Sequence, residues 1–97
     1  MAAERSVAVA DLVAEFRARI SELDRTILEA VNERLELVSA LWEVKAEQGL
    51  PFVDPEREEA LLRRLAELNP GPMSEDGLRE LFEALLAITK REVGQQA

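Results

Sequence analysis

Hydrophobic residues recur at alternating steps of three and four along the first half of the chain. This spacing keeps one apolar stripe in line along a helix. No Pro or Gly occurs between Val7 and Gln48, so we predict one uninterrupted helix that ends at the Gln48-Gly49 pair. The stripe consists of Val9, Val13, Phe16, Ile20, Leu23, Ile27, Ala30 or Val31, Leu37 or Val38, and Leu41.

Two shorter helices are predicted in the second half. Asp54 followed by Pro55 indicates a helix start, with Asp as the N-cap and Pro in the first turn, and predicts a helix over about 55–68. The Asn69-Pro70-Gly71-Pro72 segment predicts a turn, after which Ser74 caps the third helix. We expect an all-α fold, with one long N-terminal helix plus two shorter helices.

The whole chain, residues 1–97, is expected to form a single helical domain. Its ordered core is expected to span about 8–93, with loose residues Met1 to Ser6 at the start and fraying from Gly94 to Ala97 at the end.

The length of the first helix predicts a second copy of the chain. About 40 residues at about 1.5 Å each give a rod of roughly 60 Å. A compact domain of 97 residues spans only about 30–35 Å. Part of the apolar stripe would then lie in water, which monomers avoid. A two-fold homodimer with paired long helices removes this exposure.

Composition excludes several classes of chemistry. The formal net charge is −8, from 20 acidic and 12 basic residues, which argues against binding to nucleic acid or anionic membranes. The chain has neither cysteine nor histidine, which removes thiol and imidazole catalysis and leaves no ligand set for a metal. No apolar run reaches the length of a signal peptide or membrane span, so we expect a cytoplasmic protein.

Two cations lie on the apolar stripe itself. Arg34 is seven residues after Ile27, and Lys45 is four residues after Leu41. They share one helix face within about 20° and are separated by about 16 Å along the axis. Either a small anion lies between Arg34 and Lys45, or each cation pairs with an acid of the second helix. Such cations along an apolar surface suit a small polyanion, and a reaction that needs only restraint and charge stabilisation.

Other charged residues are candidates for the same site. Arg57 and Glu58 lean toward the apolar side of the second helix, and Arg57 opposes the helix dipole there. Asp54 needs no role beyond its N-cap. Arg17 lies about 25 Å along the rod from Arg34. It is therefore either a surface residue or a group that reaches the site from an antiparallel partner chain.

Several segments together resemble the all-helical (AroQ-type) chorismate mutases. These segments are Phe16-Arg17-Ala18-Arg19-Ile20-Ser21-Glu22-Leu23-Asp24, Glu33-Arg34 with Leu37-Val38, Lys45 with Gly49-Leu50-Pro51, Asp54-Pro55-Glu56-Arg57-Glu58-Glu59, and Asn69-Pro70-Gly71-Pro72. The resemblance covers roughly Leu12 to Val93. It implies an intertwined homodimer that rearranges chorismate, a dicarboxylate with an enol ether, to prephenate on the route to phenylalanine and tyrosine, without a cofactor or metal.

The resemblance also implies roles for individual residues. Arg34 would grip one carboxylate of chorismate, and Arg17 of the partner chain the other. Lys45 would bond the ether oxygen as it gains negative charge, and also a carboxylate. Arg57 would support the carboxylate end. Glu58, together with Asp54, would hold the ring hydroxyl.

The third helix departs from the family pattern. Thr89 can stand for a family Ser, but Val93 falls where many members have Gln as a second donor to the ether oxygen. Glu92 is adjacent to that position, about 100° round the helix, and could donate only when protonated. Gln95 and Gln96 lie near the end of the chain.

Two other functions remain open. One is a non-catalytic dimerisation or regulatory module that docks on DAHP synthase. The other is a lyase on the same scaffold that releases pyruvate from isochorismate. The cations on the stripe favour an enzyme over a module, and the match through Lys45–Glu59 favours a mutase over a lyase.

Overall fold

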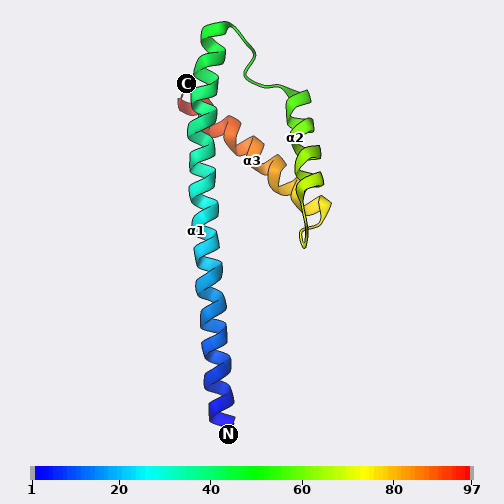
Figure 1. The fold of residues 1–97 in the computed structure, drawn as a ribbon. Coiled ribbons are helices and arrows are strands. Elements are labelled where there is room, and N and C mark those ends of the chain that lie inside the picture. Colours follow the sequence, from blue (N-terminus) through cyan, green and yellow to red (C-terminus); the bar gives the residue numbers. More distant parts are fainter. Residues whose placement is uncertain (1, 97) are drawn as a thin grey trace. The chain divides into compact units, whose positions relative to one another are not determined.

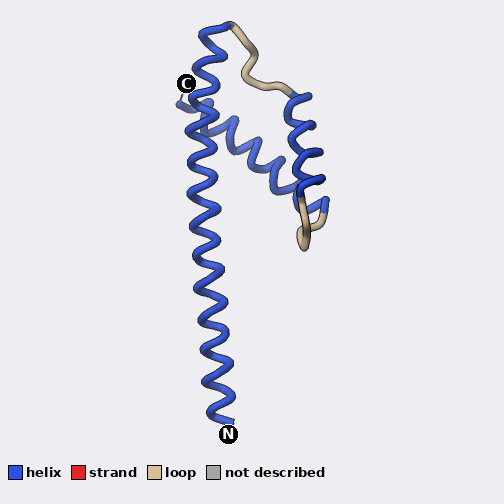
Figure 2. Tube along the Cα trace, viewed as in Figure 1, coloured by secondary structure: helices blue, strands red, loops and turns tan. Residues whose placement is uncertain are grey.

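The fold consists of helices joined by short loops, as the sequence predicts. The structure, a computed structural model, describes the backbone of residues 2–96 and the side chains of residues 7–94. Helix α1 spans Ala2–Gln48, α2 spans Pro55–Leu68 and α3 spans Glu75–Gln96 (Figure 1). Between residues 2 and 96 the remaining segments are loops and turns, with no strand (Figure 2). The predicted all-α order of one long helix and two shorter helices is therefore confirmed.

The helices extend further toward both ends of the chain than the periodic pattern does. Helix α1 begins at Ala2, ahead of the first residue of the apolar stripe. Helix α3 continues through Gly94 to Gln96, and Ala97 lies outside the described residues. Both ends are rich in strong helix formers such as Ala, Glu, Arg and Gln, and no Pro interrupts them.

Gly49 ends α1 as predicted. Its φ of +68° is a left-handed conformation that glycine adopts without steric cost. The backbone N–H of Gly49 donates to the carbonyl of Ala46 at 3.3 Å, and that of Leu50 donates to the carbonyl of Lys45 at 2.8 Å. These two bonds form a Schellman motif, which satisfies carbonyls at the helix end and fixes the backbone of Lys45.

The starts of α2 and α3 are both capped by the predicted side chains. Asp54 accepts a hydrogen bond through Oδ1 from the backbone N–H of Arg57 at 3.1 Å, and Pro55 follows it in the first turn. Ser74 accepts a hydrogen bond through Oγ from the N–H of Gly77 at 3.0 Å. Each cap satisfies a donor that the helix leaves unpaired, so both helices begin where the sequence indicates.

The turn between α2 and α3 is held by Asn69. Its Oδ1 accepts from the N–H of Gly71 at 2.9 Å, and its Nδ2 donates to the carbonyl of Met73 at 2.9 Å. Gly71 has a φ of +85°, and the bond from Gly71 to Pro72 is cis. The predicted rigid turn is present.

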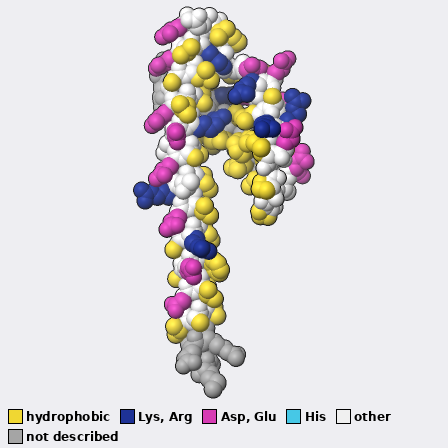
Figure 3. Space-filling model, viewed as in Figure 1, with side chains coloured by type: hydrophobic (Ala, Val, Ile, Leu, Met, Phe, Trp, Pro, Cys, Tyr) yellow, Lys and Arg dark blue, Asp and Glu magenta, His cyan; other side chains and the backbone are white. Residues whose placement is uncertain are grey.

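The chain divides into two compact units, Met1–Arg34 and Leu35–Ala97. The first unit is the N-terminal part of α1, where hydrophobic side chains lie in contact with solvent (Figure 3). Phe16 is 57% exposed, Ile20 is 56% exposed and Leu23 is 62% exposed. Its surface also carries an i,i+4 salt bridge between Arg25 and Glu29 at 3.0 Å.

The second unit contains the last part of α1 together with α2 and α3. Within it, α2 packs against α3. Buried side chains among its described residues are Leu62, Leu78, Thr89 and Val93. The ring of Phe52, in the loop that follows α1, stacks on the ring of Trp42 in α1, with centroids 5.0 Å apart. Within the described residues, no helix combines the length and the apolar character needed to cross a membrane.

Candidate functional site

Lys45 lies in the last turn of α1, where the carbonyl end of the helix favours a cation. Its Nζ donates to the carbonyl oxygen of Phe52 at 3.2 Å. The stack of Phe52 on Trp42 holds that part of the loop. Among residues 7–94, no salt bridge involves Lys45, so the alternative pairing with an acid of α2 is not seen there. The ammonium is placed beside the loop that leads into α2.

The N-cap and first turn of α2 carry three of the predicted site residues. Asp54 is the N-cap, as described above, and both its side chain and that of Arg57 are exposed. Glu58 lies one residue further, and its side chain is only 25% exposed. These positions place two carboxylates and a guanidinium at one helix end.

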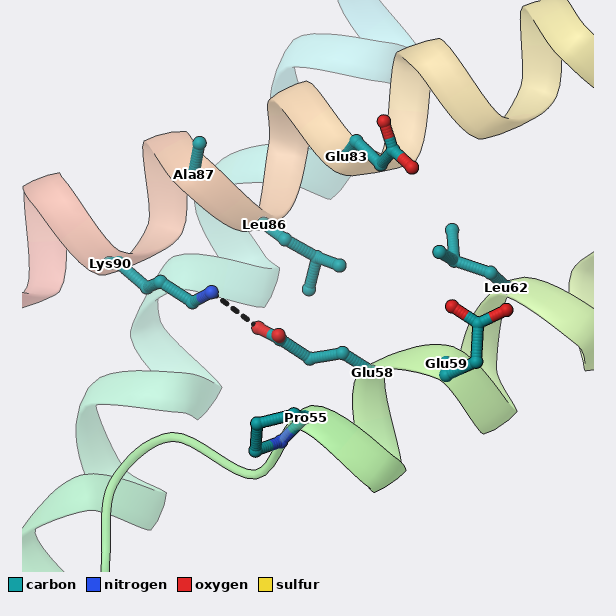
Figure 4. A pocket seen from close by; sticks show the side chains of 8 residues that line it. All are labelled: Pro55, Glu58, Glu59, Leu62, Glu83, Leu86, Ala87 and Lys90. Carbon is teal, nitrogen blue, oxygen red and sulfur yellow. Dashed lines mark ion pairs between the residues drawn. The ribbon is translucent and has the colours of Figure 1, made fainter.

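Glu58 faces a cation of α3 that the sequence analysis did not single out. The Nζ of Lys90 lies 2.7 Å from Oε1 of Glu58 (Figure 4). One signal could have found it, because Lys90 and Lys45 are the only lysines in the chain. Periodicity alone does not show which residues of α2 a given residue of α3 contacts.

The two residues lie in a hollow between the helices, which we call the α2–α3 groove. It has a volume of about 460 Å³. Its walls come from the N-terminal half of α2 and the middle of α3 (Figure 4). The lining residues are Pro55, Glu58, Glu59, Leu62, Glu83, Leu86, Ala87 and Lys90.

Arg79 pairs with the other two acids of the α2–α3 groove. Its guanidinium lies 3.0 Å from Glu59 and 3.4 Å from Glu83. The hydrogen bond from Arg79, reinforced by its charge, lowers the pKa of Glu59 from its ordinary value. The hydrogen bond to Glu59 likewise raises the pKa of Arg79. Both side chains are about half exposed, so the pair is a surface interaction that solvent screens.

The C-terminal half of α3 carries the remaining candidates. Thr89 is 4% exposed, and its hydroxyl donates to the carbonyl of Leu85 at 2.7 Å. A hydroxyl has one proton, so this bond uses the Thr89 donor within its own helix. Val93 is 3% exposed, and its side chain is apolar. Glu92 pairs with Arg91 at 3.3 Å.

Arg17 and Arg34 both lie on α1, within the first unit. Arg17 is exposed and Arg34 is partly buried. The 17 residues between them correspond to about 25 Å of helix. One small ligand therefore cannot touch both side chains of a single chain. The second unit holds the other predicted residues, which are Lys45, Asp54, Arg57, Glu58 and Thr89.

Comparison with known proteins gives consistent matches. Residues 16–93 match the chorismate mutase type II family. A bifunctional chorismate mutase/prephenate dehydratase of Neisseria gonorrhoeae is 33% identical over 82 residues, which cover 84% of this chain and 22% of that protein. A chorismate mutase of Methanocaldococcus jannaschii is 39% identical over 56 residues, covering 58% of this chain and 57% of that protein.

A solved structure has a similar fold. The chorismate mutase of Thermus thermophilus (form II) superposes with a TM-score of 0.83 at 32% identity, covering 87% of this chain and 96% of that chain. The bifunctional relatives are much longer, and this chain spans 22% of the Neisseria protein. The similarity to such relatives is confined to one part of each.

Proposed function

Because the chain belongs to the chorismate mutase type II family, we propose that it converts chorismate to prephenate. The reaction is an intramolecular Claisen rearrangement. The ether C–O bond breaks while a new C–C bond forms, and no atom enters or leaves. A site for this reaction needs to hold the substrate in a reactive conformation and to stabilise the charge that develops on the ether oxygen. The observation that carries the proposal is the family match over residues 16–93, which includes every proposed site residue.

The proposed chemistry centres on Lys45. Its ammonium donates to the ether oxygen, where negative charge builds up as the C–O bond lengthens. Arg34 binds a substrate carboxylate, and its planar fork suits bidentate contact with two oxygens. Arg57 supports the carboxylate end. These cations act without a covalent intermediate.

The ring hydroxyl is the other polar group of the substrate. We assign it to Glu58 and Asp54, whose carboxylates can accept its proton in a hydrogen bond. The location of both residues in or beside the first turn of α2 supports this assignment. We also assign Thr89 of α3 to the site, at the position where family members have a Ser. With Val93 at the position of a family Gln, Lys45 is the principal donor to the ether oxygen.

We further propose that the active form is a homodimer. The exposed apolar residues of the first unit support this, because a stripe that includes Phe16, Ile20 and Leu23 is unfavourable in water. A two-fold pair of long helices would cover it. Such a pair also lets Arg17 of one copy and Arg34 of the other serve the same substrate, which the distance along a single α1 forbids.

The decisive experiment follows chorismate with the purified protein. We expect the absorbance of chorismate to decrease faster with the protein than in buffer alone. The product should have the mass of the substrate and the chromatographic retention and NMR spectrum of prephenate. Isochorismate is tested in parallel, and release of pyruvate would identify a lyase instead. A folded protein that accelerates neither reaction at micromolar concentration would contradict the proposal.

A further inference from the structure

The α2–α3 groove contains three acids and one lysine. Arg79 lies within salt-bridge distance of Glu59 and Glu83. Lys90 lies within 2.7 Å of Glu58. Arg79 and Lys90 therefore neutralise different acids of the groove. Lys90 pairs with Glu58, the acid of the groove that the proposed mechanism uses.

The contact between Lys90 and Glu58 is short and partly protected from water. At 2.7 Å it lies in the range of charge-assisted hydrogen bonds, which are stronger than neutral ones. Glu58 is the more buried partner, with a side chain 25% exposed against 41% for Lys90. An ionised carboxylate accepts several hydrogen bonds through its two oxygens. Glu58 can thus keep Lys90 on Oε1 and still accept a hydroxyl.

We propose that Lys90 is a positioning residue for the rearrangement and that it acts through Glu58. It holds the Glu58 carboxylate in one conformation, ready to accept the ring hydroxyl of the substrate. A free Glu side chain has several rotamers, and ordering them upon substrate binding costs free energy. Because Lys90 already orders the Glu58 side chain in the free protein, substrate binding loses less conformational entropy. The inference rests on the proposed function, since it requires that Glu58 contacts the substrate.

A salt bridge that only joins α2 to α3 would have a different effect. It would contribute to stability and leave the kinetics unchanged in a folded protein. The pair of Glu59 and Arg79 is the matched control, because it joins the same two helices at 3.0 Å but uses an acid with no proposed substrate contact. Arg79→Met should behave as a structural change, and Lys90→Met as a kinetic one.

The test compares kcat/KM for chorismate in the wild type, Lys90→Met, Lys90→Arg and Arg79→Met, all verified as folded by circular dichroism. Lys90→Met should lower kcat/KM about tenfold, as expected for loss of a hydrogen bond to a charged group. Lys90→Arg should restore most of the activity, because the guanidinium also pairs with a carboxylate. Arg79→Met should stay within about twofold of the wild type.

A double-mutant cycle shows whether Lys90 acts through Glu58. On a Glu58→Gln background, the further change Lys90→Met should alter kcat/KM by less than about twofold, because the group that Lys90 orients is already gone. An equal tenfold loss on both backgrounds, or a Lys90→Met variant with wild-type kinetics, would overturn the inference. A wild type without mutase activity would instead refute the proposed function, so the two failures are distinguishable.

Discussion

The ammonium of Lys45 donates a hydrogen bond to the carbonyl oxygen of Phe52 over 3.2 Å. The bond joins the last turn of α1 to the loop before α2. An ammonium has three protons, so a bond to one neutral carbonyl leaves capacity for the two substrate contacts that the mechanism assigns to Lys45. The loop thereby orients the cation without neutralising it.

Replacing Lys45 should abolish most of the catalysis and leave the fold intact. We expect Lys45→Ala to lower kcat by about two to three orders of magnitude, as loss of a donor to a developing oxyanion does. The side chain is a partly exposed cation, so the far-UV circular dichroism spectrum should be unchanged. Arg64→Ala, which removes a surface cation paired with Glu67 in α2, is the control and should retain kcat. Unchanged kcat in Lys45→Ala would mean that the only role of Lys45 is its hydrogen bond to the Phe52 carbonyl in the loop.

Asp54 should have a structural and a kinetic effect that two substitutions separate. Asp54→Ala removes the N-cap of α2 and should lower the free energy of unfolding by about 1 kcal/mol. Asp54→Ser keeps a capping oxygen and should remain within about 0.5 kcal/mol of the wild type. If the carboxylate also holds the ring hydroxyl, both variants should lose about tenfold in kcat/KM. A Ser variant with wild-type kinetics would limit Asp54 to its role as a cap.

The shared site predicts complementation between two inactive homodimers. Arg17→Ala and Arg34→Ala should each be nearly inactive, because each removes one carboxylate contact from both sites. When the two variants are unfolded together and refolded, random assembly makes about half of the dimers mixed. In a mixed dimer one site receives both changes and the other receives neither. Activity should therefore recover to about a quarter of the wild type.

Native mass spectrometry provides the control for that experiment, because it counts the mixed dimers directly. Each variant refolded alone should stay inactive. Mixed dimers without recovered activity would mean that Arg17 acts within its own chain or only supports the fold. Sedimentation at the mass of one chain would contradict the dimer itself.

The salt bridge between Glu59 and Arg79 should make a pH-dependent contribution to stability. The folded-state pKa of Glu59 is lowered, chiefly by the hydrogen bond from Arg79. Its contribution is therefore present above the ordinary pKa of 4.5 and is lost as the pH falls through the lower folded-state pKa. We expect Arg79→Met to unfold at a lower temperature than the wild type at neutral pH. The difference should shrink as the pH falls below 4.5 and vanish once Glu59 is protonated in the folded protein.

Salt provides a second check on the same pair. Both groups are exposed, so added salt should reduce the difference in unfolding temperature at neutral pH. The raised pKa of Arg79 keeps it charged throughout this range, so the transition reports the carboxylates that pair with it, Glu59 at 3.0 Å and Glu83 at 3.4 Å. A difference that persists unchanged at low pH would assign the effect to packing of the Arg79 alkyl chain.

The helix boundaries inside the chain were predictable because each depends on local chemistry. Gly49 adopts the left-handed conformation that ends α1, and Asp54 and Ser74 satisfy the first donors of α2 and α3. These requirements act within a few residues of sequence. Helices α1 and α3 extend to Ala2 and Gln96, because helix propensity continues past the last residues of the periodic pattern. The expected ordered core of about 8–93 stays a prediction.

The candidate site was only partly predictable. Lys45 was identified because a cation interrupts an apolar stripe, which is visible in sequence. Lys90 was missed because its pairing with Glu58 depends on how α3 packs on α2. The same applies to Arg79, whose partner Glu59 is 20 residues away in sequence. The roles of all the site residues came from family resemblance and stay predictions. These residues are Arg17, Arg34, Lys45, Asp54, Arg57, Glu58 and Thr89.

The stack of Trp42 on Phe52 places an intrinsic fluorophore beside the loop that contacts Lys45. Trp42 is the only tryptophan, and the chain has no tyrosine, so ultraviolet emission above the phenylalanine range comes from this one indole. Phe52 both covers the indole and accepts the bond from Lys45. A ligand that draws the ammonium away from the Phe52 carbonyl therefore acts on the residue that shields the fluorophore. We therefore expect ligand binding at Lys45 to change the intensity and wavelength of Trp42 emission, so that binding can be measured without a label.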